Sequence, residues 1–113
     1  MMKREYKDFI KDIIDSVQDI EQFIGEMSYD EFIRDKKTLN AVIRSIEIMG
    51  EAAKSIPASI QEKNASVPWK KMSGMRDRLI HGYFGIDNEI LWKTIKEDLP
   101  PLLPIIKKLF EII

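Results

Sequence analysis

The chain has 113 residues and a formal net charge of −1, with 44% hydrophobic and 33% charged residues. This length predicts one domain, residues 1–113, and the composition is too apolar for a disordered chain and too charged for a membrane protein. No apolar run approaches the roughly 18 residues of a spanning helix, and the first seven residues contain no signal core, so we expect a cytoplasmic protein that does not interact with membranes. The absence of cysteine excludes disulfides and thiolate metal sites.

The first predicted element is an amphipathic helix that ends at Gly25. Its apolar residues recur at three- and four-residue steps, which places them on one stripe of a helix. Beyond Gly25, Ser28 can cap a short helical turn with Glu31 as its capping-box partner. The stripe consists of Tyr6, Phe9, Ile10, Ile13, Ile14, Val17, Ile20, Phe23 and Ile24.

A second long helix is predicted from Asp35 or Lys36 to Ile56, where Pro57 stops it. Gly50 lies inside this helix, where glycine costs up to about 1 kcal/mol relative to alanine. We expect that another helix packs closely against Gly50 and Ala53; the alternative is that they leave room for a ligand. The apolar face comprises Leu39, Val42, Ile43, Ile46, Met49, Ala53 and Ile56.

The second half of the chain predicts three further helices. The first begins at Pro68–Trp69 and ends near His81–Gly82, before an aromatic and glycine-rich loop. Asp87 or Asn88 caps the next helix, which residues 99–101 (Leu-Pro-Pro) break, and residues 102–113 form the last one. No alternating pattern typical of strands occurs. The sequence therefore predicts an all-α fold, an antiparallel bundle of four to five helices.

Basic residues gather in two places despite the slightly negative net charge. Lys70, Lys71, Arg76 and Arg78 face one acid, Asp77, between Trp69 and His81, and Lys3, Arg4, Lys7 and Lys11 cluster near the N-terminus. From charge alone, these groups are either solvated faces or parts of a nucleic-acid-binding surface.

The segment from Arg76 to Tyr83 combines a permanent cation, the only imidazole of the chain and a phenol. An imidazole that titrates near neutral pH can accept a proton from a ribose 2′-hydroxyl or give one to a leaving 5′-oxygen. A guanidinium can bind the scissile phosphate through two parallel hydrogen bonds. Because RNA carries its own nucleophile, such a site needs no metal. The alternative interpretation of His81 is a helix C-cap before Gly82.

The spacing Arg76, four residues, His81, one residue, Tyr83 matches the Arg-x4-His-x-Tyr motif of the HEPN-domain toxins of the HepT-like family. The chain resembles that family over nearly its whole length, and the polar residue that the family places after the arginine is Asp77 here. The other similar features are Arg44, Glu47 and residues 49–53 in the second helix, then Trp69, Trp92 and residues 98–100.

This resemblance implies a HEPN-like fold, a homodimer and a metal-independent endoribonuclease toxin without a cofactor. It implies that Arg76 and His81 are the catalytic pair acting on an RNA substrate, tRNA or mRNA. It also implies a partner, a minimal nucleotidyltransferase antitoxin that neutralises the toxin by transferring AMP to Tyr83. Two alternatives are open: a non-catalytic HEPN module that binds a nucleotide or a nucleotidyltransferase, and a helical dimer with an adaptor role.

Helix geometry constrains how the motif can work. On one straight helix, Arg76 and His81 point about 140° apart. Either the helix ends before His81, or two motifs meet across a two-fold axis, where one histidine acts as base and the other as acid. Asp77 and Arg78 are candidate supporting polar residues. Glu47 and Glu51 lie on one face of the second helix, where they could orient Arg76 or another cation of the motif, or simply be solvated.

Overall fold

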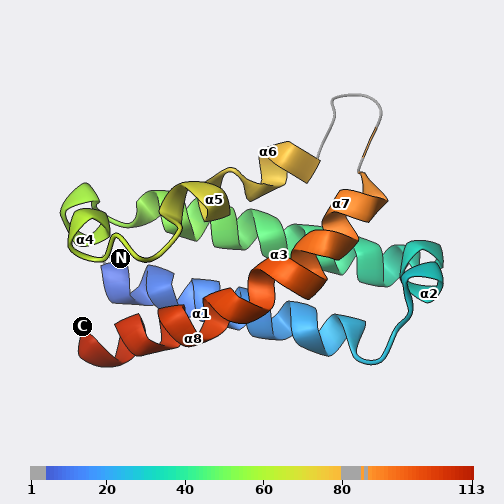
Figure 1. The fold of residues 1–113 in the computed structure, drawn as a ribbon, viewed down its shortest axis with the longest axis horizontal. Coiled ribbons are helices and arrows are strands. Elements are labelled where there is room, and N and C mark those ends of the chain that lie inside the picture. Colours follow the sequence, from blue (N-terminus) through green and yellow to red (C-terminus); the bar gives the residue numbers. More distant parts are fainter. Residues whose placement is uncertain (1–4, 80–84, 86) are drawn as a thin grey trace, which may run out of the picture.

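A computed structural model describes residues 5–79, 85 and 87–113, and every regular element in these ranges is helical (Figure 1). The first two long helices are α1 (Tyr6–Ile24) and α3 (Lys36–Ser55). The third rod consists of α5 (Trp69–Ser73) and α6 (Met75–Leu79), and the fourth of α7 (Asn88–Lys93), the π-helical turn η2 (Thr94–Asp98) and α8 (Leu99–Ile112). The short helices α2 (Tyr29–Arg34) and α4 (Ala58–Lys63) lie at opposite ends of the molecule (Figure 1).

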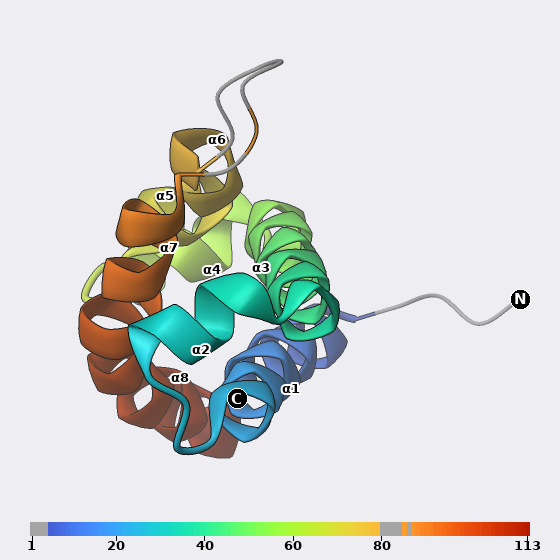
Figure 2. The same cartoon turned by 90° about the vertical axis from the view of Figure 1, so that its right-hand side faces the viewer.

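The four rods run alternately in opposite directions and surround a common core, as the end-on view shows (Figures 1 and 2). Helix α1 packs against α3 and α8, and α3 also packs against α5 and α6. The predicted stripe of α1 faces this core, except that Phe23 is exposed. The predicted all-α bundle is thereby confirmed. The largest side chains that are fully buried include Phe32, Ile10, Ile13, Ile20, Ile46, Met49 and Ile106.

Several helices begin or end at capping residues that the sequence predicted. Gly25, with φ of 50°, closes α1 by donating its N–H to the carbonyl of Glu21. Ser28 and Glu31 form the predicted capping box of α2, and the hydrogen bonds from the Ser28 backbone and side chain lower the pKa of the Glu31 carboxyl. Asp35 caps α3 by accepting from Thr38, whose backbone and hydroxyl lower the pKa of the Asp35 carboxyl. The side chain of Asp87 caps α7.

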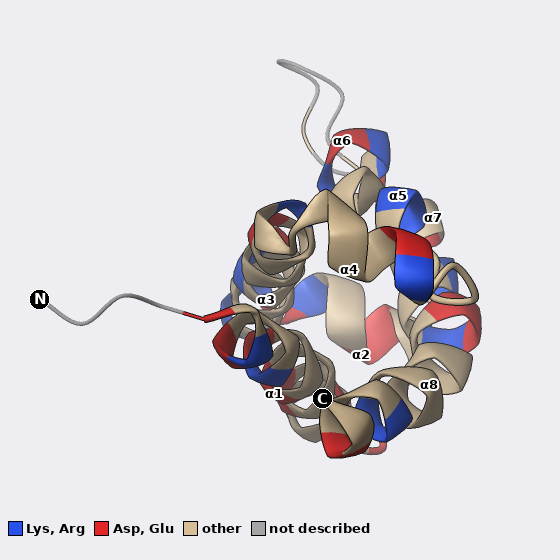
Figure 3. Cartoon of the chain, turned by 90° about the vertical axis from the view of Figure 1, so that its left-hand side faces the viewer, with Lys and Arg blue, Asp and Glu red and all other residues tan. Residues whose placement is uncertain are grey.

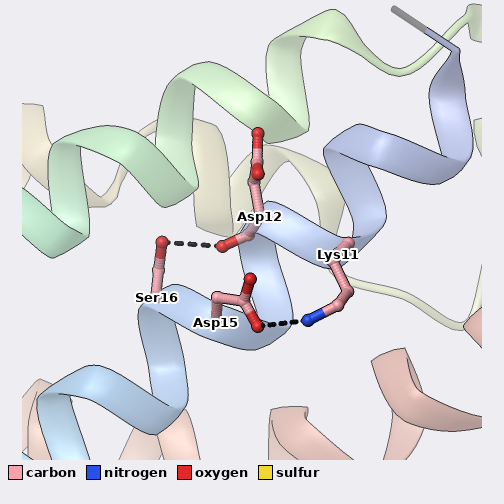
Figure 4. A network of polar contacts seen from close by, with 4 residues as sticks. All are labelled: Lys11, Asp12, Asp15 and Ser16. Carbon is pink, nitrogen blue, oxygen red and sulfur yellow. Dashed lines mark hydrogen bonds and ion pairs between the residues drawn. The ribbon is translucent and has the colours of Figure 1, made fainter.

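Two polar contacts on α1 join residues one helical turn apart (Figure 4). The Nζ atom of Lys11 lies 2.8 Å from the Asp15 carboxylate, one helical turn away. The buried hydroxyl of Ser16 donates to the carbonyl oxygen of Asp12 at 2.7 Å. Lys11 thus belongs to an ordinary solvated helix face, the first of the two interpretations of the N-terminal basic group; Lys3 and Arg4 lie outside the described residues.

The third rod differs from its prediction, because the expected continuous helix is interrupted at Gly74. The N–H of Gly74 donates to the carbonyl of Lys70, and the hydroxyl of Ser73 competes for the same carbonyl at 3.2 Å. Glycine weakens a helix through its conformational freedom, and serine side chains that bond nearby backbone favour helix ends. The predicted end of this helix near His81–Gly82 lies outside the described residues.

The prediction of a break at residues 99–101 is wrong. The chain continues from α7 through η2 directly into α8, which starts at Leu99 rather than at residue 102. Pro100 and Pro101 fall in the first turn of α8, where a missing N–H is tolerated, and the wider turn of η2 precedes them. None of the described helices has the length and apolarity that crossing a membrane requires.

Candidate functional site

Arg76 is presented to solvent by two buried neighbours on its short helix. Met75 and Leu79 are buried and hold α6 against the bundle, so the residues between them point outward. The side chain of Arg76 is 49% exposed, and its Nε lies 3.6 Å from Oε2 of Glu47 on α3. A weaker contact of 3.7 Å joins its Nη1 to the carboxylate of Asp77. The guanidinium is therefore contacted by two carboxylates through different nitrogens, and about half of the side chain stays exposed to solvent.

A cleft of about 210 Å³ opens beside Arg76, between α3 and the third rod. Gly50 lies against the third rod here: a Cβ atom there would be in ordinary van der Waals contact, 3.4 Å from the carbonyl oxygen of Met72 and 3.6 Å from that of Ser73. The expectation that another helix packs against Gly50 is thus confirmed, and the same packing builds the floor of the cleft. The lining residues are Glu47, Gly50, Glu51, Lys54, Ser73, Arg76 and Asp77.

The structure brings some of the predicted site residues together and separates others. Glu47 contacts Arg76, whereas Glu51 lines the cleft as an exposed side chain. Asp77 is 71% exposed beside Arg76. Arg78 points elsewhere, because its Nη2 donates to the carbonyl oxygen of Lys71 at 2.9 Å and so ties α6 to α5.

His81 and Tyr83 lie outside the described residues, but both ends of their segment are defined. The carbonyl of Leu79, the last residue of α6, accepts a hydrogen bond from the N–H of Asp87 at 3.1 Å. This bond joins the end of α6, the helix that carries Arg76, to Asp87 at the start of α7.

One cation near the site escaped sequence reasoning as a functional residue. Arg44 on α3 has its Nη1 3.9 Å from Oε2 of Glu47, the same oxygen that contacts Arg76. The three-residue spacing between Arg44 and Glu47 was a usable signal, since such pairs meet on a helix surface. That Glu47 also reaches Arg76 follows only from the packing of α6 on α3.

Charges elsewhere on the surface are mixed rather than segregated (Figure 3). Lys71, from the basic group between Trp69 and His81, pairs with Asp98 at 3.3 Å. Among the described residues, no group of three or more acidic or histidine side chains is arranged to hold a metal ion.

The two tryptophans are packing anchors. Trp69 is buried and donates its indole N–H to the carbonyl of Asn64. Trp92 contacts the rings of Tyr29 and Phe32, with centroids 5.8 and 5.3 Å away, and thereby fastens α2 to α7.

Comparison with known proteins identifies the family. The model of the family described as "HepT-like: Ribonuclease HepT-like" matches residues 13–109. A protein of Thermococcus cleftensis named "Probable ribonuclease HepT" is 50% identical over 101 residues, which cover 89% of this chain and 92% of that protein. A protein of Methanocaldococcus jannaschii named "Putative RNase MJ1380" is 48% identical over 113 residues, the full length of both chains.

A further relative carries a second activity in its name. It is "Gamma-glutamylcyclotransferase and putative RNase MJ0434" of Methanocaldococcus jannaschii, 39% identical over 110 residues, which cover 97% of this chain and 50% of that protein. No solved structure gives a significant match to the chain. The names of the relatives support a ribonuclease, and the match extends over nearly all of the bundle, including Glu47 and the helix of Arg76. The chain belongs to the HepT-like ribonuclease family.

Proposed function

We propose that this chain is a metal-independent endoribonuclease and the toxin of a toxin–antitoxin pair, with Arg76 and His81 as catalytic residues in a cleft between two subunits. The observation that carries the proposal is the accessible guanidinium of Arg76, held by Glu47 at the mouth of a polar cleft. Chain connectivity supports a role for His81 beside it: His81 follows Leu79 by two positions, and a chain extends at most about 3.6 Å per residue.

The chemistry needs a phosphate-binding cation, a base and an acid. Arg76 binds the scissile phosphate and stabilises the charge that grows on its oxygens. One imidazole takes the proton of the 2′-hydroxyl, the 2′-oxygen attacks phosphorus, and a second imidazolium protonates the departing 5′-oxygen. The products are a 2′,3′-cyclic phosphate and a free 5′-hydroxyl. Because the chain has one histidine, two subunits supply the two imidazoles.

The test is cleavage of total tRNA and mRNA by the purified protein in excess EDTA, with the product ends identified. We expect cyclic phosphate ends, and a loss of roughly 100- to 1,000-fold in kcat for Arg76→Ala and for His81→Ala. Arg76→Lys is also impaired, because an ammonium cannot reproduce a bidentate contact. Arg34→Ala, which removes an exposed arginine from α2, is the matched control and retains activity.

Two results would overturn this function. Undiminished cleavage by a folded Arg76→Ala protein removes Arg76 from the site, and a strict requirement for Mg²⁺ removes the metal-independent mechanism. A protein that binds RNA or a nucleotidyltransferase without cutting RNA is instead the non-catalytic HEPN module.

Neutralisation is proposed to occur by transfer of AMP to Tyr83. An added phosphodiester would repel the RNA phosphate, and the adenosine would fill the space that the RNA needs. The measurement is the intact mass after incubation with ATP, Mg²⁺ and the cognate nucleotidyltransferase. A gain of one or more AMP units that disappears in Tyr83→Phe supports the switch. A gain that survives in Tyr83→Phe but disappears in Tyr6→Phe or Tyr29→Phe moves the target.

A further inference from the structure

Glu47 joins two arginines from different helices into one cluster. Its Oε2 lies 3.9 Å from Nη1 of Arg44 and 3.6 Å from Nε of Arg76. Because both nitrogens contact one oxygen, they cannot lie more than 7.5 Å apart. Two guanidinium groups that come from α3 and α6 therefore lie near one carboxylate on one face.

The charges in this cluster leave Arg44 available to a ligand. Among the described residues, Arg76 forms ion pairs with two carboxylates, Glu47 and Asp77, whereas Arg44 forms an ion pair with Glu47 alone. Arg44 is therefore the less neutralised of the two cations. The Arg44 side chain is 63% exposed, and a contact of 3.9 Å between ions is longer than a hydrogen bond. Exposed ion pairs of this kind are weak, so a phosphate could engage Arg44 at little cost.

The alternative to phosphate binding is that Arg44 has a purely structural role and stabilises α3. A three-residue pair with Glu47 contributes about 0.2–0.5 kcal/mol to a helix. That role explains Arg44 and Glu47 but not why Arg76 of another helix shares the same carboxylate. A polyanion that follows the surface explains all three residues, because its successive phosphates need cations at short intervals.

We propose that Arg44 is a second phosphate-binding residue, which holds a phosphate next to the one bound by Arg76. The RNA backbone then passes from α6 onto α3, and Glu47 is the positioning residue that sets the separation of the two guanidinium groups. This inference rests on the proposed function, since it takes RNA as the ligand, and it adds a contact that fixes the path of the strand.

The experiment measures binding of single-stranded RNA as a function of salt in the uncleaving His81→Ala protein. For single strands, each phosphate contact contributes about 0.7 to the slope of log affinity against log salt, which corresponds to roughly fivefold in affinity at 0.1 M salt. Arg44→Ala lowers the slope and the affinity by these amounts, and Arg44→Lys restores most of both. Arg34→Ala, the control, leaves the slope unchanged. In cleavage assays with His81 intact, Arg44→Ala raises KM more than it lowers kcat.

The outcomes separate the two proposals. If RNA is cleaved and Arg44→Ala has the same salt slope as Arg34→Ala, the proposal that Arg44 binds a phosphate is wrong, and the proposed ribonuclease function is unaffected. If Arg44→Lys fails to restore the slope while the fold is intact by circular dichroism, a phosphate contact is likewise overturned. If the parent protein neither binds nor cuts RNA, both proposals fall.

Discussion

The two sides of α3 show how one helix serves both stability and chemistry. On one side, Val42, Ile46 and Met49 are completely or almost completely removed from water and pack in the core. On the other side, Arg44 and Glu51 are exposed and Glu47 is half-buried. Glu47 forms ion pairs with Arg44 and with Arg76 of the third rod, and Glu51 lines the cleft. Burial of apolar surface is worth several times more than an exposed ion pair. The buried side therefore decides whether the protein folds, and the charged side is free to be arranged for binding.

The largest effect on stability is expected on the buried side of α3, and the neighbouring residue on the charged side provides the comparison. Ile46→Ala removes a side chain that is 1% exposed and should cost about 2–5 kcal/mol of unfolding free energy. Glu47→Ala removes two ion pairs of a side chain that is 28% exposed and should cost about 1 kcal/mol or less, yet it should reduce RNA cleavage because Arg76 loses its contact on α3. Urea unfolding and the cleavage assay measure the two effects. Equal losses of stability in the two variants would contradict the division of α3.

A smaller effect is expected at Gly50, where the two sides meet. A Cβ atom 3.4 Å from the Met72 carbonyl is in ordinary contact, so Gly50→Ala should change the stability by no more than about 1 kcal/mol, with the gain in helix propensity offsetting the tighter fit. Gly50→Val adds two further methyl groups, compared with alanine, next to the backbone of α5 and should lower the unfolding free energy by about 1–3 kcal/mol. Urea unfolding compares the two. A valine variant as stable as the alanine variant would show that α5 is not held against α3 at this point.

The smallest effect on stability is expected at Asp35, the residue that caps the start of α3. Hydrogen bonds from Thr38 lower the pKa of the Asp35 carboxyl below its ordinary value of 3.8, so the ionised cap stabilises the folded state at neutral pH. This contribution is lost as the pH falls below 3.8 and through the lowered pKa. Asp35→Asn keeps an acceptor for the Thr38 N–H but does not titrate.

Melting temperatures between pH 7 and pH 3 test this cap. The difference in melting temperature between the parent protein and Asp35→Asn should be constant near pH 7. Toward pH 3 the parent protein should lose more stability than Asp35→Asn, because only its cap becomes protonated. Glu31, whose pKa is also lowered, titrates in both proteins and cancels in the comparison. A difference that does not vary with pH would show that the charge of Asp35 plays no part in capping.

Local patterns in the sequence were sufficient for most of the helices and for the family. The apolar stripe of α1, Gly25 at its end, the capping box of Ser28 and Glu31, and the stop at Pro57 all act within a few residues, so they can be read without knowing the fold. The Arg76–His81–Tyr83 spacing is equally local, and the family it indicated agrees with the comparisons. The catalytic roles of Arg76 and His81 and the modification of Tyr83 remain predictions.

Only the tertiary structure decided the features that depend on how rods pack. The sequence left Glu47 and Glu51 equivalent, because they share a helix face; the position of α6 on α3 puts Glu47, and not Glu51, in contact with Arg76. The prolines after η2 predicted a break, but the chain continues from η2 into α8, which packs along α1 and has Pro100 and Pro101 in its first turn, where a missing N–H is tolerated. Helix signals extend over a few residues, whereas these contacts join residues that are distant in the chain, and their geometry exists only once the core has formed.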